Sequence, residues 1–191
     1  MFGRRRVKCC LIGDYNVGKT SILNSFMDKP LENITSTAGI DFESKTISIL
    51  SEDVYLSVWD TAGSERFAPL LHSYIRDAEI VVIVYDTTCR TCNLVKWLRY
   101  VEQHSPKVIG ILGNKTDLTR DLREDIDDII SPWRRQSCKL VYDELSSRNS
   151  PAVKRFFKMC LRELLAKNEA TDTMPYIKFG SSQQKKRMCC T

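Results

Sequence analysis

Long hydrophobic runs are absent from this sequence. The longest uninterrupted apolar stretch, residues 80–85, is much shorter than the ~18 residues that a membrane-spanning helix needs. The first residues, MFGRRR, contain no apolar segment of the kind found in a secretory signal peptide. Glycine stands at position 3 rather than position 2, so N-myristoylation is not expected. The sequence therefore predicts neither a membrane-spanning helix nor a signal peptide.

Histidine is scarce, and His72 and His104 are the only two in the chain. The eight cysteines are scattered, and without a secretory signal this pattern favours reduced thiols over disulfides. Cys89-x-x-Cys92 has the spacing of half a zinc site, but the sequence offers no second such pair. Ordinary thiols are the favoured interpretation.

The composition is that of a globular protein with a modest charge. The chain has 191 residues and a mass of 22.0 kDa, which suits one domain of roughly 160 to 170 residues and a tail. Apolar residues make up 42% of the chain and charged residues 28%. The net charge of +5 does not by itself predict a nucleic-acid partner.

Strand-like and helix-like segments alternate along the chain. Residues 80–85 and 108–112 are apolar runs typical of strands buried on both faces, and a Ser51-Glu52-Asp53 turn predicts a hairpin of 42–50 with 54–60. The other predicted elements are strands at 6–12 and 139–142 and helices at 18–27, 90–103, 122–136 (interrupted at Pro132) and 151–167. This alternation predicts a three-layer α/β domain with a mostly parallel sheet. The pattern stops after about Asn168, and the polar residues 169–191 predict a disordered tail.

The segment Gly13-Asp14-Tyr15-Asn16-Val17-Gly18-Lys19-Thr20 matches the GxxxxGK[ST] pattern of a phosphate-binding loop in full. It follows a predicted strand and opens a predicted helix, which is the context that this pattern requires. Backbone N–H groups and the helix N-terminus would bind phosphate oxygens, Lys19 would reach the outer phosphates, and the Thr20 hydroxyl would bind Mg²⁺. A glycine turn with a chance lysine is the weaker alternative, because a strand and a helix flank the segment.

A second polar segment, Asn114-Lys115-Thr116-Asp117, follows the predicted strand at 108–112. The Asp117 carboxylate can accept both N–H groups of the guanine Watson–Crick edge, and adenine presents a different pattern there. Asn114 would connect this segment to the phosphate-binding loop, and the Lys115 stem would cover the base. Alone, the segment is equally consistent with a polar turn. Behind the phosphate-binding loop and Asp60-x-x-Gly63, it indicates a guanine site.

With these segments the chain resembles a small Ras-superfamily GTPase over about residues 7–168, and within that superfamily a Rab. The Rab marks are Ala38-Gly39-Ile40-Asp41-Phe42, Lys45-Thr46-Ile47, the run WDTAGSERF from Trp59 to Phe67, and Cys189-Cys190. The resemblance implies a three-layer P-loop GTPase fold. Its six-stranded, mostly parallel sheet has the order 2-3-1-4-5-6, with an antiparallel first pair and five helices. A GTPase domain at 7–168 would precede a flexible, hypervariable, prenylated tail at 169–191.

The resemblance also implies a set of site residues. The nucleotide contacts would be Asp14, Tyr15, Asn16, Val17, Gly18, Lys19, Thr20, Ser21, Thr37, Gly63, Asn114, Lys115, Asp117, Ser146, Ser147 and Arg148. The Mg²⁺ ligands would be Thr20, Thr37 and, through a water, Asp60. The catalytic positions would be those of Lys19, Thr37 and Ser64. Thr37 and the Gly63 N–H would sense the γ-phosphate, and its loss would release both loops.

Three departures from the family pattern affect turnover. No aromatic residue lies between Met27 and Phe42, where Rabs carry one that packs on guanine, and this predicts faster nucleotide release. Tyr15 is bulky at a loop position that is small in many relatives and would crowd the arginine finger of an activating protein. Ser64 replaces the glutamine that orients the attacking water, and its side chain is several bonds shorter. Together these departures predict slow GTP hydrolysis.

The chain ends in Lys185-Lys186-Arg187-Met188-Cys189-Cys190-Thr191. Met188 at the fourth position from the end excludes a C-a-a-X box. The ending is similar to the CC-x of Rabs, which carry two geranylgeranyl groups, and two lipid chains are sufficient for stable anchoring. A solvated basic tail with two unmodified cysteines is the alternative.

The favoured function is a Rab-like switch that binds GTP or GDP with Mg²⁺ and hydrolyses GTP slowly to GDP and phosphate. It would regulate vesicle and membrane trafficking by recruiting effectors, which would contact Ile40, Phe42, Trp59, Phe67 and Tyr74. The resemblance further implies an exchange factor, a GTPase-activating protein, a prenylation escort and a GDP-dissociation inhibitor. These partners would act on a monomer that cycles between the cytosol and the cytosolic face of an intracellular membrane. No nucleic-acid partner is expected. The alternative is a nucleotide-binding scaffold with little or no hydrolysis. A P-loop kinase or ATPase is disfavoured by the Asn114–Asp117 segment.

Overall fold

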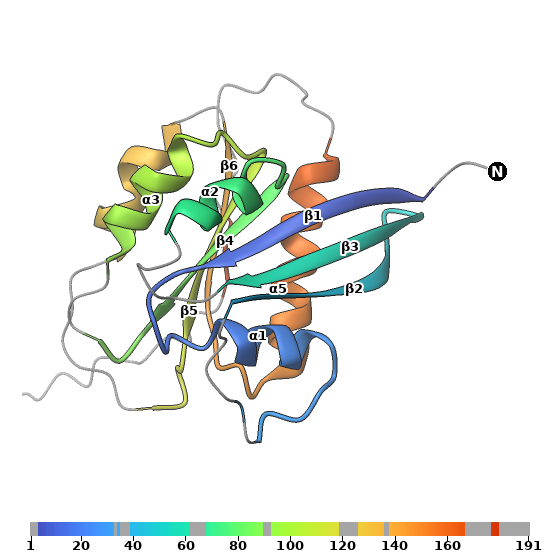
Figure 1. The fold of residues 1–191 in the computed structure, drawn as a ribbon, viewed down its shortest axis with the longest axis horizontal. Helices are drawn as coiled ribbons and strands as arrows, with labels where there is room; N and C mark the ends of the chain where they lie inside the picture. The colour runs from blue at the N-terminus through green and yellow to red at the C-terminus, as the bar shows by residue number, and fades with distance from the viewer. Residues whose placement is uncertain are drawn as a thin grey trace, which may run out of the picture.

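The computed structural model describes residues 4–32, 34, 39–61, 68–89, 93–118, 126–135, 138–166 and 177–179. A central sheet lies between helices on its two faces (Figure 1). In chain order the elements are β1 (Arg5–Ile12), α1 (Lys19–Phe26), β2 (Ile40–Ile49), β3 (Glu52–Thr61), α2 (Ala68–Ile75), β4 (Ile80–Asp86), α3 (Leu94–Glu102), β5 (Val108–Asn114), α4 (Ile126–Ile130), the 3₁₀-helix η2 (Ser131–Arg135), β6 (Lys139–Glu144), α5 (Ser150–Leu165) and β7 (Ile177–Phe179).

The strands lie in the order β2-β3-β1-β4-β5-β6-β7. The β2–β3 pair is antiparallel and every other pair is parallel. The predicted order 2-3-1-4-5-6, with its antiparallel first pair and five α-helices, is therefore confirmed for the part of the chain that the structure describes. The sheet continues one strand beyond the predicted six.

The prediction of no regular structure after about residue 168 is wrong at β7. Its three residues pair in parallel register with Val141, Tyr142 and Asp143 on the outer edge of β6. Isoleucine and phenylalanine favour strands, and they stand here in an otherwise polar segment. Because α5 lies between β6 and β7 in the sequence, the three elements form a βαβ unit, the usual connection between parallel strands.

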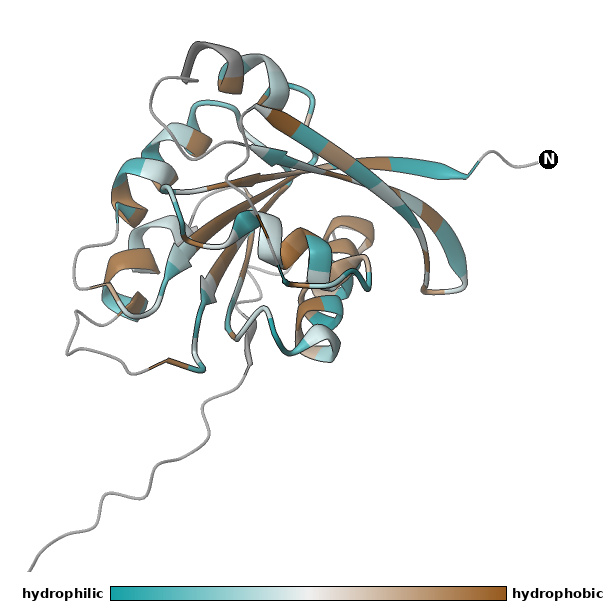
Figure 2. Cartoon of the chain, turned by 60° about the horizontal axis from the view of Figure 1, so that its bottom comes forward, coloured by the Kyte–Doolittle hydropathy of each residue, from teal (hydrophilic) through white to brown (hydrophobic). Residues whose placement is uncertain are grey.

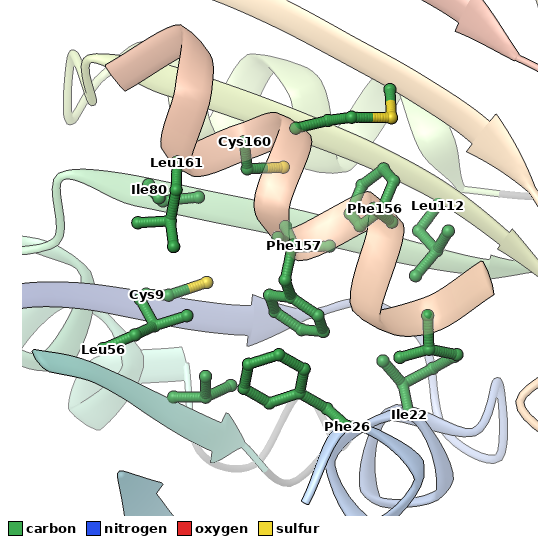
Figure 3. Close-up of a cluster of buried hydrophobic side chains, with 14 of the residues drawn as sticks. Cys9, Ile22, Phe26, Leu56, Ile80, Leu112, Phe156, Phe157, Cys160 and Leu161 are labelled. Carbon is green, nitrogen blue, oxygen red and sulfur yellow. The ribbon is translucent and has the colours of Figure 1, made fainter. Parts of the chain in front are cut away.

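The central strands direct alternate side chains into two hydrophobic cores. On one face, Cys9 and Leu11 of β1 pack with side chains of α1 and α5, where the rings of Phe26 and Phe157 lie 4.2 Å apart (Figure 3). On the other face, Cys10 packs with side chains of α2, α3 and α4. The six residues of β4 before its last are all buried, which explains the continuous apolar run in the sequence.

The β2–β3 hairpin is amphipathic. Along β3, Val54, Leu56 and Val58 are buried, whereas Tyr55 between them is exposed, and Figure 2 shows the mixed hydropathy of the hairpin beside the apolar central strands. The turn consists of Leu50 and Ser51, with φ of 49° and 62°, instead of the predicted residues 51–53. Positive φ at both central residues of a two-residue turn matches the twist of the paired strands. The observed turn begins one residue earlier than the predicted turn.

Helix ends follow local chemistry. The Asn149 side chain accepts a hydrogen bond of 3.2 Å from the Ala152 N–H and so caps α5, whose second residue is Pro151. The predicted helix at 122–136 is described as α4 ending at Ile130 and then η2, because Pro132 cannot donate to the preceding turn. Within the described residues, no helix is both long and apolar enough to span a bilayer.

Candidate functional site

The loop between β1 and α1 depends on two glycines. Gly13 has φ of 140°, and a Cβ there would lie 2.1 Å from the Val84 carbonyl oxygen. Gly18 has φ of 93°, and a Cβ there would lie 2.3 Å from Asn114 Nδ2. Asn16 adopts φ of 60°, a conformation that asparagine tolerates better than most residues. Both glycines are thus required by the close approach of neighbouring atoms, and a loop of this shape is suited to binding an anion.

Lys19 extends its side chain along this loop. Its Nζ donates hydrogen bonds to the Gly13 carbonyl at 3.0 Å and to the Asp14 carbonyl at 2.8 Å. Burial lowers the pKa of Lys19 from 10.5 to about 8, although Asp60 and Asp14 act in the opposite direction. A phosphate oxygen beside this ammonium would favour its charged form.

Thr20 and Asp60 meet at the mouth of the loop. The Thr20 hydroxyl donates a 2.6 Å hydrogen bond to Asp60 Oδ2, and the Asp60 residue is only 1% exposed. A hydroxyl and a carboxylate, both oxygen ligands, are suited to Mg²⁺. The donor set therefore fits the metal predicted from the sequence, with Asp60 at the end of β3 and Thr20 in the first turn of α1.

Asn114 joins the two halves of the site. Its Nδ2 donates to the Val17 carbonyl at 2.9 Å, and its Oδ1 accepts from the Ser147 N–H at 2.9 Å. The Asn114 side chain lies at the end of β5 and is buried. One side chain thus fixes the phosphate-binding loop and the 146–148 loop in a single network.

Lys115 makes a second connection to the loop. Its Nζ donates to the Asn16 carbonyl at 2.7 Å and pairs with Asp86 Oδ2 at 2.7 Å. Burial raises the pKa of Asp86, but hydrogen bonds from Lys115 and Thr88 outweigh burial and hold that pKa below its ordinary value. The lysine stem therefore crosses from the 114–117 segment to the phosphate-binding loop.

Asp117 and Arg148 lie together at the open end of these loops. Arg148 Nε is 3.5 Å from Asp117 Oδ2, and the two side chains are 82% and 35% exposed. The Arg148 N–H donates to the Ser146 hydroxyl oxygen at 3.1 Å, which shapes the 146–148 loop. The Asp117 carboxylate, which is about one-third exposed here, can accept hydrogen bonds from the N–H groups at the edge of a base.

Two contacts of this site were not predicted from the sequence. The Asp14 carboxylate accepts from Trp97 Nε1 at 2.9 Å and from Asn93 Nδ2 at 3.1 Å, so the phosphate-binding loop is tied to α3. Trp97 lies within the helix predicted at 90–103 and was not among the predicted site residues. An indole N–H near a helix start is the one sequence signal for such a role, and it does not identify the acceptor.

A tyrosine–glutamate network supports the base-side loops. Glu144 Oε1 accepts from the Tyr85 hydroxyl at 2.7 Å and from the Tyr142 hydroxyl at 2.9 Å. Burial raises the pKa of Tyr85, so the phenol stays protonated and donates. Glu144 ends β6 just before the 146–148 loop, which makes the network a support for that loop.

Within the described residues, one set of predicted site residues lies together at the carboxyl ends of β1, β3, β5 and β6: Asp14 to Ser21, Asp60, Asn114, Lys115, Asp117 and Ser146 to Arg148. Tyr15 in this set is 65% exposed. Thr37, Gly63, Ser64, Cys189 and Cys190 lie outside the described residues, so their roles stay predictions. The assembled groups can bind a polyphosphate, a divalent cation and a base.

Comparison with known proteins agrees with this geometry. The Ras family model matches residues 8–166. The chain is 34% identical to the Ras-related protein Rab-22A of Mus musculus over 193 residues, covering 97% of this chain and 98% of that protein. The chain belongs to the Rab group of the Ras family of small GTPases, GTP-binding switches in membrane trafficking that bind GTP or GDP with Mg²⁺ and hydrolyse GTP to GDP.

Proposed function

We propose that GTP and GDP bind at the carboxyl ends of the strands, against residues 13–21, 114–117 and 146–148 of this chain. The observation that carries this assignment is the Asn114 side chain, which holds both Val17 and Ser147. Backbone N–H groups of residues 14–21 and Lys19 contact the phosphates, with the Thr37 and Gly63 positions completing the γ-phosphate contacts. Asp117 and the 146–148 loop contact the guanine, and the Lys115 stem covers it.

Thr20 and Asp60, together with Thr37, hold the Mg²⁺ in this assignment. The support is the adjacent pair of oxygen donors at 2.6 Å. When bound, Mg²⁺ neutralises charge on the phosphate oxygens. Arg148 pairs with Asp117, the carboxylate that would contact the guanine.

Hydrolysis is slow in this proposal because Ser64 is too short to orient the attacking water, and Tyr15 restricts the approach of an activator. The exposed Tyr15 side chain on the phosphate-binding loop supports the second part. Single-turnover GTP hydrolysis tests the first. Ser64→Gln is expected to raise the intrinsic rate by about 10-fold or more, since positioned groups of this kind contribute at least that much.

Ser73→Gln is the matched control for that experiment, because Ser73 is an exposed residue of α2 without an assigned role. It should leave the rate unchanged. Equal rates for the natural protein and Ser64→Gln would show that Ser64 does not limit hydrolysis.

Effectors bind a surface that includes three aromatic residues. The rings of Phe42 and Trp59 stack with centroids 4.8 Å apart, and the Tyr74 ring lies 5.6 Å from that of Trp59. Phe42 is 55% exposed, so its ring is accessible to a partner at this surface. Ile40 at the start of β2 is included in this proposed surface. Phe67 lies outside the described residues, so its part in effector binding stays a sequence-based prediction. The exchange factor and the activating protein act on the same region.

The C-terminal tail would attach the protein to a membrane. A prenylation escort would present the chain for modification, and geranylgeranyl groups on Cys189 and Cys190 would anchor a monomer to the cytosolic face of an intracellular membrane. A GDP-dissociation inhibitor would return it to the cytosol. Mass spectrometry of the C-terminal peptide from native cells should show two isoprenoid masses. An unmodified peptide in the membrane fraction would contradict lipid anchoring.

A further inference from the structure

The only two histidines of the chain lie against each other. His72 belongs to α2, and His104 follows α3, 32 residues later. His72 Nδ1 and His104 Nε2 are 2.9 Å apart, and the ring centroids are 4.9 Å apart. His72 is exposed and His104 is partly exposed, so solvent reaches the pair.

The second nitrogen of His104 shows which atom can bind a ligand. His104 Nδ1 lies 3.0 Å from the Tyr100 carbonyl oxygen, which can only accept a hydrogen bond. The proton of the neutral ring is therefore on Nδ1, and the Nε2 lone pair is directed toward His72. A histidine that binds a metal almost always donates its other N–H to a carboxylate, a backbone carbonyl or a water, which orients the ring and sets its tautomer.

We propose that His72 Nδ1 and His104 Nε2 chelate a divalent transition-metal ion between α2 and α3. On binding, the proton that the two nitrogens share moves to Nε2 of His72, so both metal-facing nitrogens are free to coordinate. With metal–nitrogen bonds of ~2.0–2.1 Å, nitrogens 2.9 Å apart subtend an angle of about 90° at the metal. In that triangle each metal–nitrogen bond is inclined by about 45° to the line between the two nitrogens, so both rings rotate on binding to aim their lone pairs at the metal.

The angle indicates which ion fits. An angle of about 90° is that of neighbouring ligands in square-planar or octahedral sites, which Cu²⁺ and Ni²⁺ prefer. Tetrahedral Zn²⁺ would require the nitrogens to separate to about 3.3 Å. Within the described residues, no group of three or more His, Cys, Asp and Glu side chains is placed to hold a metal. Water completes the coordination, and the ion links α2 to α3.

The test is titration of tag-free, full-length, GDP-bound protein with Ni²⁺, with Mg²⁺ in excess to keep the nucleotide site occupied. Isothermal calorimetry should give one Ni²⁺ per chain. His72→Gln and His104→Gln should each weaken Ni²⁺ binding by about 10- to 100-fold or more. Loss of an outer-shell partner alone weakens metal binding by that factor, and these variants remove a ligand. Glutamine retains hydrogen-bonding ability, and a thermal melt verifies that each variant is folded.

Electron paramagnetic resonance with substoichiometric Cu²⁺ identifies the ligands directly. The spectrum should show coupling to two imidazole nitrogens in the natural protein and to one in each single variant. Cys89→Ser is the matched control, because it removes an exposed thiol without changing the histidines. The proposal is overturned if the double variant binds Ni²⁺ with the affinity and stoichiometry of the natural protein, or if no binding is detected in the natural protein.

Discussion

At the scale of single residues, Lys19 is a charged side chain in a buried environment. It is only 6% exposed, and two backbone carbonyls accept its hydrogen bonds. Burial lowers its pKa from 10.5 to about 8. Between these values the unfolded chain binds a proton that the folded chain has released, so this group makes stability rise with pH. At lower pH both states are protonated, and the full cost of the buried charge is present.

Replacing Lys19 should change how the stability of the protein depends on pH. In nucleotide-free protein, the unfolding free energy of the natural chain minus that of Lys19→Met should rise between pH 8 and 10.5. The rise should reach at most about 3 kcal/mol, since each pKa unit corresponds to about 1.36 kcal/mol. Urea unfolding at a series of pH values measures the difference, and subtraction removes groups common to both proteins. A difference that stays constant with pH would show that Lys19 titrates normally.

At the scale of elements, β7 protects the outer edge of the sheet. Ile177→Pro removes a backbone donor and should detach this short strand from β6. The β6 amides that face β7 should then exchange with solvent about 10-fold faster or more, which corresponds to loss of one net hydrogen bond. Hydrogen exchange followed by NMR measures this. Ser181→Pro, beyond the strand, is the control, and equal exchange in both variants would count against a stabilising role for β7.

The six longer strands could be predicted because burial imposes a local pattern, such as the continuous apolar run of β4. β7 has only three residues, so its pattern is too short to recognise, and pairing with β6 holds it in place. The hairpin turn was misplaced by one residue because Leu50 and Ser51 are not the residues that usually mark a positive-φ turn. An element that is stabilised by a distant partner, as β7 is, therefore cannot be predicted from a local sequence pattern. The same holds for a turn whose residues are unusual for its conformation.

Over the whole molecule, the site combines predictable and unpredictable parts. Gly13, Gly18 and Asn114 belong to short motifs whose spacing is set by backbone geometry, so the sequence identifies them. The contact of Trp97 with Asp14 joins positions 83 residues apart, and its existence depends on the packing of α3 beside the loop. Local patterns carry no information about such a pairing.

The coupling of the site across the molecule depends on Asn114. Asn114→Ala removes a donor to the Val17 carbonyl and an acceptor for the Ser147 N–H, both at 2.9 Å. Each buried group left without a partner costs about 1–3 kcal/mol, and the phosphate and base loops lose their common support. We expect lower stability and GDP dissociation at least about 10-fold faster, since a change of 1.4 kcal/mol corresponds to tenfold.

Asn149→Ala is the matched comparison for Asn114→Ala, because it removes the cap of α5 and lowers stability by about 1 kcal/mol without touching the Val17 contact. Stopped-flow release of a fluorescent GDP analogue, alongside urea unfolding, separates the two effects. If both variants release nucleotide at the same rate for a given loss of stability, Asn114 acts only as a structural residue. If Asn114→Ala alone accelerates release, the two loops bind nucleotide as one unit, and any partner that displaces either loop will loosen the whole nucleotide.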